Sequence, residues 1–179
     1  MIETGIKLIE NINYIIGSDD NGLYKISAML IDELLHSGKK VVIIDVSGYK
    51  ILCNQNHENC ITLQGYSEPE DILMLCNRYE NKVDYIFMNL IPYAIGGILD
   101  AVKNVNIPLV MIGNFIEHNL LIDDIKHQLF RTGYSALASA YYINEDYLCT
   151  FYEMRNHISI NPQRYKIIKR ESDIDKLIS

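Results

Sequence analysis

The chain has 179 residues, of which 49% are hydrophobic and 22% charged, and its formal net charge is −7. These values fit one globular domain over residues 1–179, and the negative charge argues against a protein that binds nucleic acid over its whole surface. No apolar run approaches the roughly 18 residues that cross a bilayer, and the N-terminus lacks the features of a secretory signal, so we expect a cytoplasmic chain without a membrane partner.

Predicted strands and helices alternate from residue 12 to residue 112. Apolar residues predict a strand over 12–16 that ends at Gly17, and apolar residues at spacings of three and four predict a helix from Leu23 that stops at Gly38. Later segments continue the pattern with a strand at 41–44, a strand at 61–63, a helix at 67–80 capped by Ser67, a strand at 85–90, a helix at 98–103 and a strand at 108–112. This alternation predicts a parallel sheet with helices on both faces.

The C-terminal third has a different pattern. A helix is predicted over 123–131, and two strands over 141–144 and 147–153 are joined by a turn at 144–146. A last strand is predicted near 165–168. We expect these strands to be antiparallel and to extend one edge of the sheet.

The turn after the first predicted strand has the glycine spacing of a phosphate-binding loop. In the motif G-x-x-x-x-G-K-S/T the glycines let backbone N–H groups face the phosphates, the lysine neutralises them, and the hydroxyl ligates Mg²⁺. Here the two glycines and the residues between them are Gly17, Ser18, Asp19, Asp20, Asn21 and Gly22. Leu23 and Tyr24 follow, where the lysine and the small hydroxyl belong. Lys25 comes two residues late, which turns it about 200° around a helix.

The glycine pair alone also fits a generic turn between a strand and a helix, with no connection to nucleotides. In its full context the chain resembles the RecA/RadA/KaiC family of P-loop ATPases over about residues 5–170. Residues 12–45 look like the family's phosphate-loop strand, helix and second strand, residues 83–90 like the strand that ends in a Mg²⁺-organising Asp, and residues 107–115 like the strand that ends in a nucleotide-sensing residue.

The resemblance extends to residues 148–168, which look like the family's terminal strands. It implies an α/β fold with a RecA-like P-loop NTPase core. In this fold a mainly parallel sheet is flanked by helices and carries antiparallel strands at its C-terminal edge.

The positions at which the resemblance places catalytic groups hold other residue types. Ser47 stands where the family has the Glu that activates water, Asn89 stands for the Mg²⁺ Asp, and Phe115 stands for the sensing Gln. Phosphoryl transfer depends on positioned charge and metal, so we expect no hydrolysis, no bound metal and no cofactor. A register shift of one or two residues would bring Asp45 or Asp84 into consideration.

Five cations and no acid lie between residues 155 and 170, namely Arg155, Arg164, Lys166, Lys169 and Arg170. This cluster fits contact with a nucleic-acid backbone, with Tyr165 stacking on a base. It also fits a solvated edge hairpin whose cations discourage pairing between sheets. Both interpretations remain open from the sequence.

The four cysteines are too sparse for a disulfide framework. Cys53, His57 and Cys60 have the chemistry of zinc ligands, but no fourth ligand is evident nearby, so a polar surface loop with incidental cysteines is the alternative that we favour. Cys76 and Cys149 fall on predicted helix and strand positions where cysteine acts as a small hydrophobic residue.

The resemblance and the replaced catalytic residues together favour a non-catalytic relative of the recombinase paralogs. By resemblance, such proteins assist homologous recombination by docking on a RecA/RadA-type recombinase or on one another, and some bind DNA. We therefore expect a protein partner or a homo-oligomer, with DNA as a weaker ligand. The alternatives are a KaiC-like signalling or motility-associated scaffold, and a nucleotide sensor that binds without hydrolysis.

Overall fold

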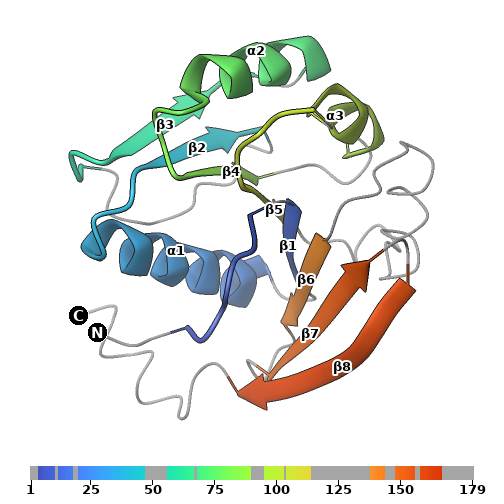
Figure 1. Cartoon of the computed structure of the whole chain (residues 1–179). Helices are drawn as coiled ribbons and strands as arrows, with labels where there is room; N and C mark the ends of the chain where they lie inside the picture. The colour runs from blue at the N-terminus through green and yellow to red at the C-terminus, as the bar shows by residue number, and fades with distance from the viewer. Residues whose placement is uncertain are drawn as a thin grey trace.

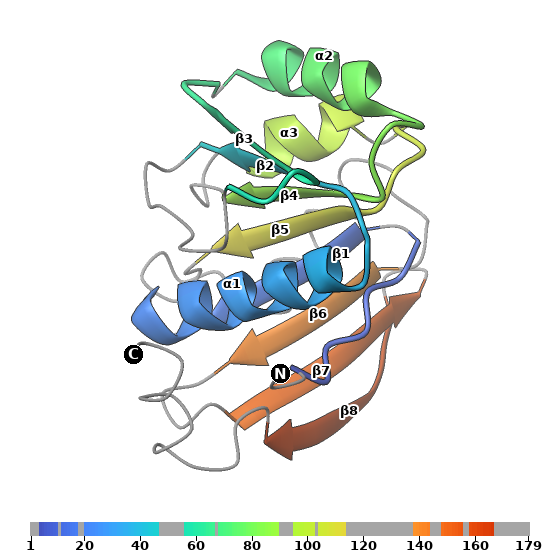
Figure 2. The same cartoon turned by 90° about the vertical axis from the view of Figure 1, so that its left-hand side faces the viewer.

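The computed structural model of the chain is built on one sheet with helices on both sides (Figures 1 and 2). None of the helices in its described part combines the length and apolar character that a bilayer crossing needs. The structure describes residues 4–10, 12–17, 20–46, 56–66, 68–89, 95–102, 104–113, 138–143, 148–155 and 158–166.

The described residues form eight strands and three helices. In chain order these are β1 (Ile12–Gly17), α1 (Asp20–His36), β2 (Val41–Asp45), β3 (Cys60–Gln64), α2 (Pro69–Tyr79), β4 (Tyr85–Asn89), α3 (Ile95–Val102), β5 (Leu109–Gly113), β6 (Ala138–Ile143), β7 (Leu148–Arg155) and β8 (Ile158–Lys166). The order across the sheet is β3-β2-β4-β5-β1-β6-β7-β8. The first six strands of that order are parallel, and β7 and β8 are antiparallel to their neighbours.

Alternate residues of a strand are buried on opposite faces of the sheet. On β2, Val41 and Ile43 join the core beneath α1, whereas Val42 and Ile44 join the core beneath α2 and α3. All five residues of this strand are buried, as its continuous β-branched run predicts for a central parallel strand. The mainly parallel α/β sheet with an antiparallel C-terminal edge is therefore confirmed.

Two predicted boundaries near α2 and β8 were wrong. The residue that caps α2 is Glu68 rather than the predicted Ser67, and Glu68 makes no side-chain capping bond. Pro69 occupies the first helical turn, as predicted. The last strand starts at Ile158 rather than near 165, and its pairing with β7 shifts register between Phe151 and Glu153. Pro162 lies in this irregular stretch, where a residue without an N–H is tolerated on an edge strand. The predicted helix at 123–131 and turn at 144–146 lie outside the described residues.

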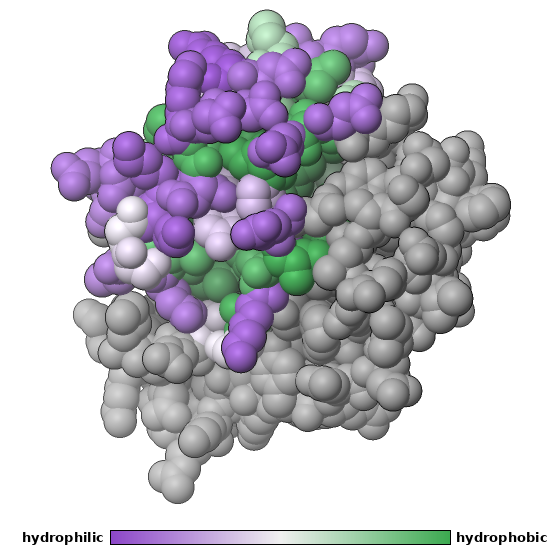
Figure 3. All heavy atoms as spheres, viewed as in Figure 1, coloured by the Kyte–Doolittle hydropathy of each residue, from purple (hydrophilic) through white to green (hydrophobic). Residues whose placement is uncertain are grey.

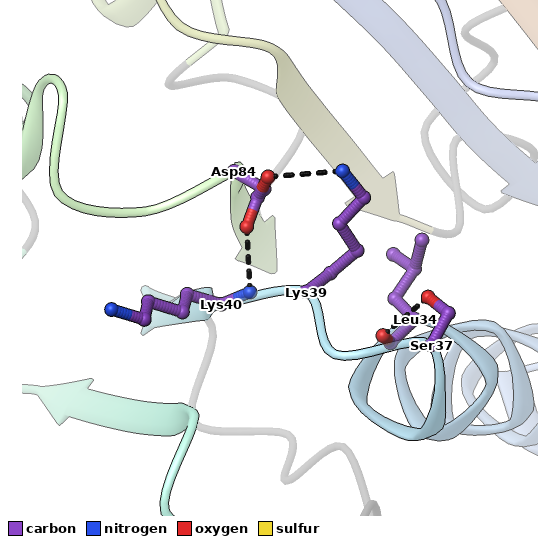
Figure 4. A network of polar contacts seen from close by, with 5 residues as sticks. All are labelled: Leu34, Ser37, Lys39, Lys40 and Asp84. Carbon is purple, nitrogen blue, oxygen red and sulfur yellow. Dashed lines mark hydrogen bonds and ion pairs between the residues drawn. The ribbon is translucent and has the colours of Figure 1, made fainter.

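The end of α1 is fixed to the start of β2 and β4. Gly38 adopts a φ of 81°, and bonds from Lys39 N to the Leu34 carbonyl (3.0 Å) and from Gly38 N to the Leu35 carbonyl (3.0 Å) close a Schellman motif. Asp84 then accepts bonds from Lys39 Nζ (3.1 Å) and from the Lys40 backbone N–H (2.8 Å), as Figure 4 shows.

We expect Asp84→Asn to flatten the acid dependence of stability. The backbone N–H of Lys40 and the ammonium of Lys39 hold the pKa of Asp84 below its ordinary value of 3.8. A depressed carboxyl pKa stabilises the fold above the unfolded pKa, and this contribution is lost as the pH falls through the folded pKa. Because the side chain is 36% exposed, the effect stays below about 1 kcal/mol. Urea unfolding should give the wild type a higher free energy of unfolding than the variant at about pH 6, and the two should be equal at about pH 2.

Asn13 ties the N-terminal segment to the sheet. Its side chain is fully buried on β1, accepts a bond from Ile9 N (2.9 Å), and donates to the carbonyls of Ile9 (3.1 Å) and Leu109 (3.2 Å). Upstream, Thr4 donates to Glu33 of α1 through its backbone N–H (3.1 Å) and its hydroxyl (2.9 Å). Residues 4–10 are thus held against their own domain.

We expect Asn13→Ala to lower the free energy of unfolding by about 2 kcal/mol, because it leaves the part-buried backbone groups of Ile9 and the buried carbonyl of Leu109 without these bonds. Urea denaturation measures the change. Asn77→Ala, at an exposed position of α2, is the control and should stay within about 0.5 kcal/mol of wild type. Equal effects of the two variants would contradict the anchoring role of Asn13.

Candidate functional site

The carboxyl ends of the central parallel strands meet at one edge of the sheet. Register pairs Asp45 of β2 with Asn89 of β4, Asn89 with Ile112 of β5, and Gly113 with Ile16 of β1. Ligands of open α/β sheets bind outside this edge, and the first turn of α1 lies on the same side of the molecule (Figure 2). This edge is therefore the candidate site.

Asp84 is not part of this edge. It precedes β4, whose last residue Asn89 lies five residues further, or roughly 16 Å along an extended strand. Its carboxylate is bonded to Lys39 and Lys40 at the opposite edge. A shifted alignment with the family would bring in Asp45 or Asp84, and of these two acids Asp45 alone lies at the candidate site.

The turn after β1 is shorter than a phosphate-binding loop. The helix was predicted to start after Gly22, but α1 starts at Asp20, so two residues separate it from Gly17. This three-residue difference exceeds the one or two residues by which helix ends ordinarily vary. The helix dipole favours an acidic residue in the first turn, and Asp20 at this position is consistent with the early start. The backbone of Asp20, Asn21 and Gly22 is thus helical instead of curling around a phosphate.

Leu23 belongs to the hydrophobic core. Its side chain is fully buried in the cluster beneath α1, together with Ile26 and Leu30 further along the helix. Tyr24 is partly buried against the same cluster. Lys25 is partly buried, and within the described residues it forms no hydrogen bond or ion pair. The two positions that would carry the phosphate lysine and the hydroxyl are therefore filled by residues that pack.

The polar centre of the candidate site is the pair Asp45 and Asn89. Asn89 is fully buried, Asp45 is 8% exposed, and Asn89 Nδ2 donates to Asp45 Oδ1 at 3.5 Å. The adjacent backbone bond from Val46 N to the Asn89 carbonyl (3.1 Å) holds the two strand ends together. A Mg²⁺ site would have a second carboxylate at the position of Asn89. The amide of Asn89 instead directs its positive N–H group toward the carboxylate of Asp45.

Several predicted residues of the loops around this edge lie outside the described residues. They are Ser18, Asp19, Ser47, Asn114 and Phe115. Sequence reasoning identified Asp45 and Asn89 separately but missed their hydrogen bond. The available signal was that each residue directly ends a buried strand, which places polar side chains at a common edge when the strands are parallel neighbours.

The cations of the C-terminal strands lie at opposite ends of the strand pair β7 and β8. Arg155 pairs with Ile158 at the amino edge, whereas Lys166 pairs with Leu148 at the carboxyl edge, roughly 14 Å from β1 across three strand spacings. Arg164 lies near Lys166 and is roughly 20 Å along β8 from the Arg155 end. Lys169 and Arg170 lie outside the described residues. Arg164 and Lys166 would thus form one contact with a nucleic acid, and Arg155 would not take part in that contact.

The cysteines within the described residues do not gather with other ligands. Cys60 is buried beneath α1, while the Nδ1 of the partly exposed His57 accepts a bond from Asn59 N at 3.2 Å. The described part of the chain contains no group of three His, Cys, Asp or Glu residues placed to hold a metal ion. Cys76 is fully buried, and desolvation raises its pKa to about 12, so its thiol packs as a hydrophobic group. Cys53 lies outside the described residues, as does the side chain of Cys149.

Comparisons with known proteins identify the fold. No protein-family model matches the chain, and no curated protein matches its sequence. Its structure is similar to one described as the structure of a DnaB-like replicative helicase and its interactions with primase, with a TM-score of 0.59 and 8% sequence identity. The match covers 91% of this chain and 56% of that chain, so this chain spans just over half the length of the helicase. At this identity the likeness shows the fold alone, an α/β fold consistent with the RecA-like arrangement.

Proposed function

We propose that this chain is a non-catalytic RecA-fold protein that acts by binding another protein, as recombinase paralogs do in DNA recombination and repair. The observation that carries the proposal is the burial of Leu23. Where a working phosphate loop presents a lysine to the triphosphate, this chain has a leucine that is fully buried beneath α1. A core position cannot present a charge to ATP unless the helix moves away from the sheet.

Two further observations support the proposal. The early start of α1 leaves two residues after Gly17, too few for backbone N–H groups to surround a phosphate. Asn89, in place of an acid, donates to Asp45 and lowers the negative charge that would attract Mg²⁺. The phosphate cation, the phosphate-binding backbone and the metal ligand thus all differ from the P-loop pattern, and phosphoryl transfer depends on all three.

We infer that this domain binds another protein. A similar solved structure is described as that of a DnaB-like replicative helicase and its interactions with primase, so that protein interacts with another protein, which is consistent with the proposal. For this chain we infer docking on a RecA/RadA-type recombinase, with self-association as the second form of assembly. A KaiC-like scaffold would share the protein-binding role but have no effect on recombination.

The test combines phosphate release with partner binding. Purified chain is incubated with ATP and Mg²⁺, with and without single-stranded DNA, and the recombinase of the same genome serves as the positive control. We expect no phosphate release above buffer and saturable binding to the immobilised recombinase by interferometry. Phosphate release that scales with the concentration of this chain would refute the non-catalytic role, and absence of recombinase binding would favour the scaffold.

A DNA shift assay at several salt concentrations separates the recombination and scaffold roles further. If DNA contacts β8, Arg164→Ala/Lys166→Ala should abolish the shift, while Arg155→Ala at the opposite edge should retain it. No shift for the wild type would favour the scaffold. Stabilisation by ATP without turnover would identify a nucleotide sensor.

A further inference from the structure

Helix α2 forms an outer layer of the described fold. Figures 1 and 2 both place it at the margin of the molecule, with the sheet and α3 on its inner side. The inner face of the helix contributes Ile72, Leu75 and Cys76 to the core. The residues of the outer face are exposed, namely Glu70, Met74, Asn77 and Arg78. Over α2, at the top of Figure 3, hydrophilic residues surround a small apolar area.

The charges on and around α2 are separated along the helix. Three acids lie at its N-terminal end and two cations lie near its C-terminal end, namely Glu68, Glu70 and Asp71, and Arg78 and Lys82. One further acid, Glu80, accepts a bond from the Asn106 N–H at 3.2 Å. The helix dipole alone favours this separation of charge. It does not account for the exposed methionine between the two charged ends.

Met74 lies midway between an acid and a cation of opposite charge. Its side chain is 54% exposed, the highest value among the large hydrophobic residues of the described part. Glu70 precedes it by four residues and Arg78 follows it by four, so the three form one row along the helix with steps of roughly 6 Å. Glu70 and Arg78 are thus roughly 12 Å apart along the axis, too far to pair with each other.

The two charges of this row have no opposite charge beside them. Within the part of the chain that the structure describes, the ion pair between Lys39 and Asp84 does not involve α2, and neither Glu70 nor Arg78 forms another. The guanidinium of Arg78 instead lies over the ring of Tyr79, 5.7 Å from its centroid. The row therefore presents a negative, an apolar and a positive group, in that order, on the outside of the fold.

An antiparallel copy of the same helix matches this order. A contact with two-fold symmetry uses the same surface on both chains. An axis through Met74 would place the methionines of two copies together and Glu70 of each copy opposite Arg78 of the other. We propose that the chain forms a two-fold symmetric dimer through the outer face of α2. This inference rests on the proposed function, in which the chain acts by binding a protein and self-association is one form of assembly, and it names the surface.

Other occupants of this face fit it less well. A parallel copy would bring the two acidic ends together, and like charges in proximity disfavour association. A basic segment of another protein would pair with Glu70 and Asp71 but would also meet Arg78 and Lys82, and an acidic segment would meet the reverse obstacle. The antiparallel copy pairs both ends of the helix.

Charge reversal tests the pairing of the two ends. Sedimentation velocity over a concentration series should show a reversible equilibrium between monomer and dimer for the wild type. Glu70→Arg gives the row two basic ends and Arg78→Glu gives it two acidic ends, so each variant alone should dimerise at least about tenfold more weakly. An equimolar mixture of the two variants, each shown to be folded by circular dichroism, should associate again. Lys40→Glu makes the same charge change as Arg78→Glu at an exposed position outside α2 and should dimerise as wild type.

A cysteine in place of Met74 tests the position of the axis. A residue on a two-fold axis contacts its own copy. Met74→Cys should therefore form a disulfide-linked dimer under mild oxidation, and should do so faster than the wild type or Asn104→Cys at an exposed position outside α2. Equal rates for the three proteins would place the contact elsewhere and overturn the proposal.

Two further results would overturn the dimer, and they leave the proposed function separately testable. One is a wild type that stays monomeric up to about 1 mM, and the other is a mixture of the two charge variants that fails to associate. Phosphate release and recombinase binding are measured on the same samples. A monomeric chain that releases no phosphate and binds the recombinase would overturn the dimer alone. A dimer that hydrolyses ATP would refute the non-catalytic role and leave the dimer intact.

Discussion

Leu23→Lys, which restores the lysine of a phosphate-binding loop, is expected to destabilise the chain by about 3–5 kcal/mol and to confer no ATP binding. The reason is the position of the side chain, which is fully buried beneath α1. The ammonium group would enter an apolar cluster without a partner, and a buried unpaired charge is among the most unfavourable substitutions in a core. Urea denaturation followed by circular dichroism measures the loss.

Leu23→Met is the matched control, because it preserves volume and apolar character and should change stability by less than about 1.5 kcal/mol. The double variant Leu23→Lys/Tyr24→Thr rebuilds the full motif, and it should also fail to bind ATP, since α1 still starts at Asp20. A stable lysine variant that gained nucleotide binding would show that the turn after β1 can hold a triphosphate.

Asn89→Asp, which restores the acid of the Mg²⁺ site, is expected to lower the free energy of unfolding by about 3 kcal/mol. The wild-type amide donates to Asp45 at 3.5 Å, and the variant would place two carboxylates at that separation in a buried pair. Thermal unfolding at neutral pH measures the loss, and Asn104→Asp at an exposed position is the control for adding one charge. Millimolar Mg²⁺ should not restore the stability. Full restoration by Mg²⁺ would reveal a working metal site at the ends of β2 and β4.

Much of the parallel sheet could be predicted because its signals are local. The run from Val41 to Ile44 predicts a central strand by itself, and the observed strand matches it to within one residue. Gly38 ends α1 because its φ of 81° suits glycine, which the sequence also indicates. The antiparallel pair formed by β6 and β7 was predicted from alternating residues around a turn.

The errors arose where distant segments or competing local signals decide the structure. The start of α1 was placed after Gly22 on glycine spacing, whereas Asp20 in its first turn favours an earlier start. Most of β8 was missed because Pro162 weakens a strand pattern that the edge position tolerates. The bond between Asp45 and Asn89 depends on the register of two strands that are far apart in the chain, which periodicity alone does not give.

The claim that the turn after β1 binds no nucleotide can be tested by isothermal titration of the full chain with ATP in the presence of Mg²⁺. We expect no heat of binding beyond dilution at millimolar nucleotide, and the same result with ADP. A saturable isotherm with one nucleotide per chain, weakened by substitution of Lys25 or Asp45, would contradict the claim and place a functional nucleotide site at the carboxyl edge of the sheet.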